Sequence, residues 1–257
     1  MSKYNTFSCK QFTLSHAQCA MKVGTDALVL GSMAGSLALE SPQRILDVGT
    51  GCGILALMMA QSFPESVVTG IEIESICAGE AKENILHSRF SKRVEIVHSS
   101  FQEFSDKQNV KAFNFILSNP PYFVGSLPST EVDRSVARHT QSLSYVELLQ
   151  GSSALLMEGG KFMCILPAEA EDSILSEAQK HQFLPHTITT IFHRAQGEGK
   201  RKVFLFEKRE FEIEPQNKKL ISEDILRSDL VLFEVEENGR QKRTEAYNRL
   251  SHRFYLR

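Results

Sequence analysis

Hydrophobic and polar residues alternate along this chain with two different periods. Short apolar runs predict buried strands at 43–48, 67–72, 93–97, 113–118, 160–166, 184–193 and 201–209. Apolar residues at helical spacing predict helices at 53–62, 75–88, 144–157 and 168–181. Because strands and helices alternate, the pattern predicts an α/β fold with a mostly parallel sheet and helices on both faces.

The last two of these strands depart from the alternation. Only the loop 194–200 separates them, which is too short for a crossover helix, so we expect them to pair antiparallel. Farther on, Asn238-Gly239 between apolar residues predicts a hairpin, and a helix should follow near 243–251. We expect a single domain, 1–257, made of an N-terminal cap (1–40), a core (41–210) and a C-terminal hairpin with a helix (211–257).

The apolar run 113–118 ends abruptly in a rigid polar tetrapeptide, Asn119-Pro120-Pro121-Tyr122, which we call the proline hook. Two consecutive prolines stop any ladder or helix, because each ring removes an N–H donor and fixes φ. The Asn119 amide oxygen and the Pro120 carbonyl are acceptors, and Tyr122 offers a flat face. They suit a planar group carrying –NH₂, such as adenine or a primary amide. The alternative is an ordinary Asn-Pro turn followed by a core tyrosine.

Glycines at 49, 51 and 53 follow the first core strand and precede a helix. Such a strand, glycine loop and helix are typical of a nucleotide-binding βαβ unit. The third glycine comes one place too early for the dinucleotide motif. Asp47, just before the loop, would repel a pyrophosphate but could pair with the ammonium of a methionine-like ligand. The pattern therefore favours S-adenosylmethionine over a nicotinamide cofactor.

Glu72 ends the next predicted strand, about twenty residues past the glycine loop, where an acid can hold both ribose hydroxyls. Glu74 is the nearby, lower-ranked alternative for this role, and the less favoured interpretation is that Glu72 is a solvated surface acid. The glycine loop and the proline hook should face each other across the carboxyl edge of one sheet. That combination resembles amino-group methyltransferases.

Further segments resemble one family among these amino-group methyltransferases. They are Phe12-Thr13-Leu14, the run from His16 to Gly31 that includes Lys22-Val23-Gly24-Thr25-Asp26, then Arg138-His139-Thr140, Thr244-Glu245-Ala246-Tyr247 and Phe254-Tyr255-Leu256. With the hook, they closely resemble the bacterial tRNA1(Val) adenine-N6 methyltransferases over about residues 7 to 256. The resemblance implies a Rossmann-like class I methyltransferase fold with a seven-stranded sheet and an antiparallel last strand. It also implies S-adenosylmethionine as donor and no metal.

Residue roles follow from this resemblance. The cofactor site is expected to hold Lys22, Thr25, Asp26, Asp47, Gly49, Gly51, Gly53, Glu72, Ile73, Ser100, Phe101 and Asn119. Thr25 and Asp26 would contact the methionine end, although they could also be a plain helix cap. Lys22 could form an ion pair with Asp47. Ser100 stands near the place where the family usually carries an adenine-contacting Asp.

On the substrate side, we expect Tyr122 and Phe123 to stack on the base. We expect Arg134, Arg138 and His139 to lie beside the base. They belong to a loop, 129–142, that could close over the substrate. The partner would be the anticodon loop of a tRNA. A net charge of −2 gives no global attraction to RNA, so its contact surface must be local. Two other basic clusters compete: 194–202 and 240–243. Each cluster is equally well explained as a solvated face.

Composition sets further limits. The 257 residues, 42% of them hydrophobic, suit one α/β domain with a large core. No apolar run is long enough to span a membrane, and the N-terminus lacks the apolar segment of a secretion signal. Five scattered cysteines without zinc spacing favour reduced thiols in the cytoplasm. We expect a cytoplasmic monomer without a metal.

Three alternatives remain open. A primary amide fits the hook as well as adenine, so the chain could methylate a glutamine in a protein such as a release factor; DNA adenine is a related option. Glutamine methyltransferases usually carry a sizeable helical domain before the core, and here only about forty residues precede it. The chain could also be a cofactor-binding module without catalysis. Its departure at Ser100 supports that option, and the intact hook argues against it.

Overall fold

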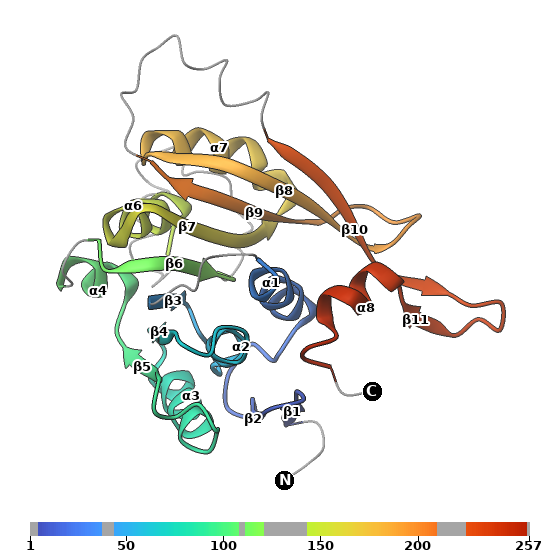
Figure 1. Cartoon of the computed structure of the whole chain (residues 1–257), viewed down its shortest axis with the longest axis horizontal. Coiled ribbons are helices and arrows are strands. Elements are labelled where there is room, and N and C mark those ends of the chain that lie inside the picture. The colour runs from blue at the N-terminus through green and yellow to red at the C-terminus, as the bar shows by residue number, and fades with distance from the viewer. Residues whose placement is uncertain (1–4, 38–43, 108–110, 121–142, 210–224, 256–257) are drawn as a thin grey trace.

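The computed structural model describes residues 5–37, 44–107, 111–120, 143–209 and 225–255. Among these, a nine-stranded sheet has the order β11-β10-β8-β9-β7-β6-β3-β4-β5 (Figure 1). The predicted strands are β3 (Arg44–Val48), β4 (Val67–Glu72), β5 (Val94–His98), β6 (Phe113–Ser118), β7 (Leu156–Pro167), β8 (Phe183–Arg194) and β9 (Arg201–Lys208). The expected α/β fold class is therefore confirmed.

Strand β9 is inserted between β7 and β8 and runs antiparallel to both. The pairs β6–β3, β3–β4, β4–β5 and β6–β7 are all parallel. The seven predicted strands thus form a mostly parallel sheet with its last strand antiparallel.

The expected strand number, seven, is too low for the described sheet. The C-terminal segment adds β10 (Leu226–Val235) parallel to β8, and β11 (Gln241–Arg243) antiparallel to β10. The predicted hairpin at Asn238-Gly239 is confirmed: Gly239 has a φ of +78°, a conformation that glycine adopts without strain. Instead of standing apart, this hairpin continues the sheet beyond β8, because β10 pairs with the backbone groups that β8 leaves open.

Helices cover both faces of the sheet. One face packs against α1 (Thr25–Gly35), α2 (Ile54–Ser62), α3 (Ser75–Leu86) and α8 (Glu245–Ser251). The other packs against α4 (Phe101–Lys107), α6 (Tyr145–Leu155) and α7 (Glu171–Lys180), which follows the short 3-10 turn η1 (Ala168–Ala170). Strand residues alternate between the two cores: Ile45 joins the first and Leu46 the second. Both layers are visible in Figure 1.

The two ends of the described chain meet beside α1. A short hairpin, β1 (Thr6–Ser8) and β2 (Thr13–Ser15), precedes α1. The Lys10 amide donates to the Phe254 carbonyl at 2.8 Å, and the Phe254 ring is buried against α1 at Gly35. In the described residues, no helix is both long and apolar enough to cross a bilayer.

Candidate active site

Strands β6, β3 and β4 lie side by side and end together. Val48 of β3 faces Ser118 of β6 on one side and Ile71 of β4 on the other. The Ser118 hydroxyl also donates to the Val48 carbonyl at 2.9 Å. Gly49 and Asn119 therefore leave the sheet from adjacent positions on its carboxyl edge, where parallel sheets bind ligands. The start of the proline hook and the glycine loop therefore follow neighbouring strands at one edge of the sheet, as the sequence predicts.

Part of the expected site lies outside the described residues. Asn119 is half-buried and Pro120 is buried. The predictions for Pro121, Tyr122, Phe123, Arg134, Arg138, His139 and the loop 129–142 concern residues that the structure does not describe.

The glycine loop has a backbone that other residues rarely adopt. Gly49, Gly51 and Gly53 have φ values of +73°, +55° and +89°. A Cβ at Gly49 or Gly51 would meet nothing within 4 Å, so these two residues border open space. Glycine is thus required by conformation, and the loop leaves room for a ligand to approach the backbone. Gly53 then begins α2 as its N-cap.

Asp47 lies beneath the loop and is fully buried. Its Oδ2 accepts a hydrogen bond from the Thr50 hydroxyl at 2.5 Å, whereas its Oδ1 has no partner among the described residues. Burial raises the pKa of Asp47 to about 7; the Thr50 bond and the backbone of Ala56 lower this pKa, and the negative charge of Glu72 raises it. A buried carboxylate oxygen without a partner is costly, and a cationic ligand would stabilise it.

Glu72, the last residue of β4, is also buried, so it is not a solvated surface acid. Its Oε2 accepts the Gly51 amide and its Oε1 accepts the Glu74 amide, both at 2.9 Å. These bonds fix the carboxylate against the glycine loop, and its remaining lone pairs can accept hydroxyls. The neighbouring Ile73 is 38% exposed, and its carbonyl lies 3.0 Å from Nε2 of His98.

Ser100 and Phe101 follow β5, whose last residue His98 faces Glu72. The Ser100 hydroxyl accepts the Glu103 amide at 3.2 Å and so caps α4. The Phe101 ring is buried against Gly151 of α6. Both residues thus have structural roles here, and their contact with the cofactor adenine stays a prediction.

The N-terminal candidates are placed differently from expectation. Exposed Lys22 donates to the carbonyls of His16 and Ala17, at 2.6 and 2.8 Å, so the ion pair with buried Asp47 was a wrong prediction. The N-cap residue of α1 is Gly24, and no side chain caps the helix. The alternative that Thr25 and Asp26 are a plain helix cap is therefore also wrong. Asp26 instead accepts Arg201 Nε at 3.0 Å and ties α1 to β9.

Three residues near the site were missed: Thr50, Glu80 and Asn84. Thr50 stands three places after Asp47, a spacing at which a hydroxyl can reach back to a carboxylate. Glu80 and Asn84 are four apart on α3, hence on one helix face. Such a pair usually indicates a solvated surface, yet both side chains are buried here.

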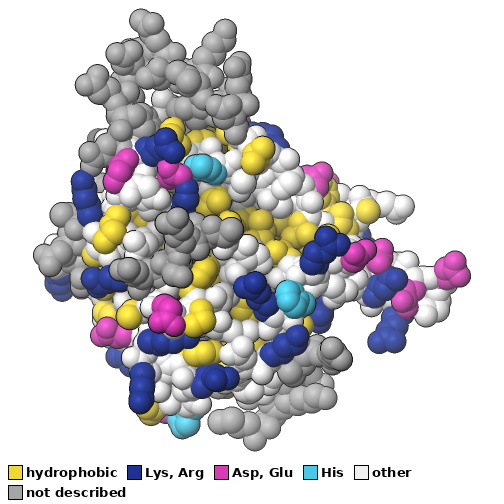
Figure 2. All heavy atoms as spheres, viewed as in Figure 1, with side chains coloured by type: hydrophobic (Ala, Val, Ile, Leu, Met, Phe, Trp, Pro, Cys, Tyr) yellow, Lys and Arg dark blue, Asp and Glu magenta, His cyan; other side chains and the backbone are white. Residues whose placement is uncertain are grey.

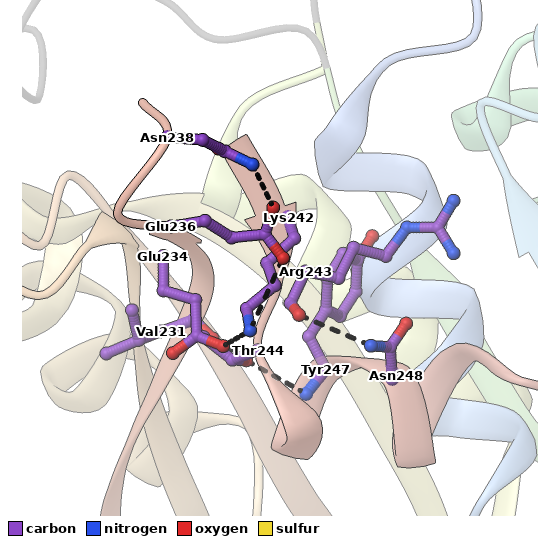
Figure 3. Close-up of polar contacts among 9 residues, drawn as sticks. All are labelled: Val231, Glu234, Glu236, Asn238, Lys242, Arg243, Thr244, Tyr247 and Asn248. Atoms are coloured by element: carbon purple, nitrogen blue, oxygen red, sulfur yellow. Dashed lines mark hydrogen bonds and ion pairs between the residues drawn. The ribbon is translucent and has the colours of Figure 1, made fainter. Parts of the chain in front are cut away.

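Acids pair with three cations of the first described basic cluster and with Lys242 of the second. Arg201 pairs with Asp26, Lys202 with Glu171, and Lys200 with Glu198 at 3.8 Å. Figure 3 shows Lys242 between Glu234 and Glu236, at 3.4 and 3.7 Å. The Arg243 guanidinium lies 3.6 Å from the centroid of the Tyr255 ring. On the face drawn in Figure 2, lysines and arginines are interspersed with acids, without a single basic stripe among the described residues.

Comparison with solved structures shows the fold. A predicted O-methyltransferase from Agrobacterium tumefaciens aligns with a TM-score of 0.65 and 18% identity, over 89% of this chain and 96% of its own. A 16S rRNA N2 G1207 methyltransferase from Thermus thermophilus, solved with AdoMet and guanosine, aligns with a TM-score of 0.53 and 21% identity, over 79% and 50%. At these identities the likeness concerns the fold alone.

Sequence comparison shows the family. The model of the methyltransferase small domain matches residues 20–178. The tRNA1(Val) (adenine(37)-N6)-methyltransferase of Bacteroides thetaiotaomicron is 36% identical over 97% of both chains. The protein of the same name from Bacteroides fragilis is 37% identical over 98% of both. The chain therefore belongs to the tRNA1(Val) (adenine(37)-N6)-methyltransferase family, within the methyltransferases that carry this small domain.

Proposed function

We propose that this protein transfers a methyl group from S-adenosylmethionine to the exocyclic N6 of adenine 37 in tRNA1(Val). Relatives of that name match nearly the whole chain. The observation that carries the proposal is the bond from Ser118 to Val48, which joins the strand before the hook to the strand before the glycine loop. A donor and an acceptor held at these two places would be neighbours.

The residues present fit the cofactor. The open space beside Gly49 and Gly51 leaves room for it, and Asp47 Oδ1 offers a buried, unpaired acceptor to an ammonium. Glu72, fixed by the loop amides, would accept the ribose hydroxyls. Ser100, Ile73 and Phe101 would border the adenine. When bound, S-adenosylmethionine supplies an electrophilic methyl group on a sulfonium.

The hook would act on the accepting nitrogen. Adenine N6 is a poor nucleophile, because its lone pair is delocalised into the ring. The Asn119 amide oxygen and the Pro120 carbonyl would accept its two N–H hydrogens, favour a pyramidal nitrogen and stabilise the positive charge that grows there. The new N–C bond forms as the S–C bond breaks, S-adenosylhomocysteine leaves, and the methylated nitrogen loses a proton. Most of the acceleration would come from positioning, without a strong base.

The target base must first leave its stack. Turning an adenine out of an anticodon loop costs roughly a few kcal/mol. Stacking on Tyr122, with Phe123 closing the other side, would offset part of that cost. Arg134, Arg138 and His139 would hold the phosphates next to the flipped nucleotide.

The test is the variant Asn119→Ala, assayed with labelled S-adenosylmethionine and tRNA1(Val) transcript. We expect methyl transfer to fall about a hundredfold or more, because the variant loses an interaction made in the transition state. Its affinity for S-adenosylmethionine, measured by calorimetry, should stay close to wild type. Asn248→Ala, at an exposed position of α8, is the matched control and should retain activity.

Two results would refute the proposal. Undiminished transfer by Asn119→Ala would remove the hook from the mechanism. Labelled methyl recovered in a protein fraction, with no N6-methyladenosine in digested tRNA, would assign a glutamine substrate instead.

A further inference from the structure

The Glu80 carboxylate binds a turn of the chain that precedes the core. It accepts hydrogen bonds from the Ser15 hydroxyl at 2.6 Å and from the backbone amides of Ala17, Gln18 and Cys19, at 2.7 to 3.2 Å. Burial alone would raise the pKa of Glu80, but these bonds outweigh it and lower the pKa to about 2. The carboxylate therefore stays ionised at neutral pH. All of these hydrogen-bond donors come from one segment.

Asn84 lies one turn later on α3 and connects the same segment to the glycine loop. Its Oδ1 accepts the Ser15 amide at 2.8 Å. Its Nδ2 donates both to the Ser15 carbonyl at 2.7 Å and to the Cys52 carbonyl at 2.8 Å. One side chain thus joins α3, the glycine loop and the segment around Ser15.

That segment, residues 15–24, closes on itself and is called the N-terminal loop below. The Val23 amide donates to His16 Nδ1 at 2.9 Å, and Lys22 donates to the carbonyls of His16 and Ala17. The loop leads directly into α1, where Asp26 binds Arg201. Its position is therefore set at one end by Glu80 and Asn84, and at the other by β9.

We propose that Glu80 and Asn84 are positioning residues for the cofactor, which hold the N-terminal loop closed against the glycine loop. This inference deepens the proposed function, because it rests on S-adenosylmethionine binding beside the glycine loop. Through Asn84, the closed loop keeps Cys52 of the glycine loop in place. If closure favours the cofactor, the cofactor must favour closure by the same factor.

The test uses Glu80→Gln in the full-length protein. A glutamine keeps the shape but replaces one acceptor oxygen by an NH₂ that faces backbone N–H donors, so the loop loses several bonds. We expect the Kd for S-adenosylmethionine to rise about tenfold or more, and kcat at saturating cofactor to stay within about threefold. Glu83→Gln is the matched control, because Glu83 lies on the same helix with a side chain that is 69% exposed.

Cys19 gives a readout of loop closure that does not depend on activity. It is only 2% exposed in the closed loop. We expect Glu80→Gln to speed its alkylation by iodoacetamide, followed peptide by peptide by mass spectrometry. Added S-adenosylmethionine should slow alkylation of Cys19 in the wild type. Cys164, which is fully buried in the sheet, should stay protected in every sample.

The proposal is overturned if Glu80→Gln exposes Cys19 while its Kd for S-adenosylmethionine stays within twofold of wild type. It is also overturned if the cofactor leaves Cys19 alkylation unchanged. Should Glu80→Gln fail to fold, Asn84→Ala breaks only the link through Ser15 and Cys52, and the same two criteria apply to it. These measurements need no RNA. A protein that binds the cofactor without methylating tRNA would refute the proposed substrate. It would leave the proposed role of Glu80 and Asn84 in cofactor binding intact.

Discussion

At the scale of single residues, the burial of Asp47 costs free energy. Asp47 is fully buried, and one of its carboxylate oxygens has no partner among the described residues. Such a group is stable as a neutral acid and unfavourable as an anion, unless a ligand supplies positive charge. The fold thus carries a cost at Asp47 that cofactor binding would relieve.

The first prediction concerns Asp47→Asn in the absence of cofactor. The folded pKa, about 7, lies above the unfolded value of about 3.9. The carboxylate therefore costs nothing below pH 4, and the wild type loses stability relative to the variant as the pH rises to about 7. By linkage the full difference is roughly 4 kcal/mol. Urea unfolding of both proteins at a series of pH values measures it.

The difference between the two proteins is the informative quantity. Glu80 and Glu207, whose pKa values are lowered to about 2, destabilise both alike in strong acid. A difference that stays constant from pH 4 to pH 8 would show that Asp47 is ionised in the free protein. The variant should also bind S-adenosylmethionine more weakly, because it lacks the negative charge.

At the scale of elements, contacts between helices support the site. Gly151 of α6 lies against the Phe101 ring at the start of α4: a Cβ there would come within 2.5 Å of the ring. Gly79 also lies within a helix, α3, but a Cβ there would meet nothing within 4 Å. These two glycines differ only in what surrounds them.

The second prediction compares Gly151→Ala with Gly79→Ala. The first should cost about 1 to 3 kcal/mol, because the buried Phe101 ring must move. The second should stabilise by up to about 1 kcal/mol, since alanine favours the helix. Chemical unfolding of both variants decides this. Equal shifts would mean that α4 and α6 are not packed as described.

The comparison of predicted and observed elements shows where sequence patterns suffice. Strands 67–72 and 113–118 match to the residue, because both are short segments rich in β-branched or aromatic residues and bounded by turn residues. Helix α4 was missed because only two of its residues, Phe101 and Phe104, are buried. The three-residue strands β1 and β2 are too short to show a period.

Contacts between distant segments could not be predicted. The start of the hook and the glycine loop were correctly expected at neighbouring strand ends, because both follow buried parallel strands. The pairing of β10 with β8 depends on which sheet edge is open, and local sequence does not specify that. Glu80 has no local signal, since its partners lie more than sixty residues earlier, as the bond to Cys19 shows.

The distribution of charge decides where RNA can bind on the whole molecule. Acids pair with Arg201 and Lys202 in the first described basic cluster and with Lys242 in the second, and the net charge is −2. Arg134, Arg138 and His139 follow the hook in sequence and lie outside the described residues. They remain the preferred RNA contacts.

The third prediction compares Arg138→Ala with Lys242→Ala. Loss of a phosphate contact at Arg138 should weaken tRNA binding several-fold and lower the slope of log K against log salt by about one. Lys242 already pairs with Glu234 and Glu236, so its removal should change neither quantity. Filter binding across a salt series measures both. The reverse result would place the RNA on the C-terminal hairpin.

The packing of α8 on α1 has a consequence for biosynthesis. Phe254, more than two hundred residues after α1, is buried against Gly35, and Tyr247 lies wholly inside the same core. A nascent chain could build the central strands first, but α1 would lack this cover until α8 had left the exit tunnel. We therefore expect α1 to reach its final packing only late in synthesis, and a chain truncated before Glu245 to be less stable than the full chain.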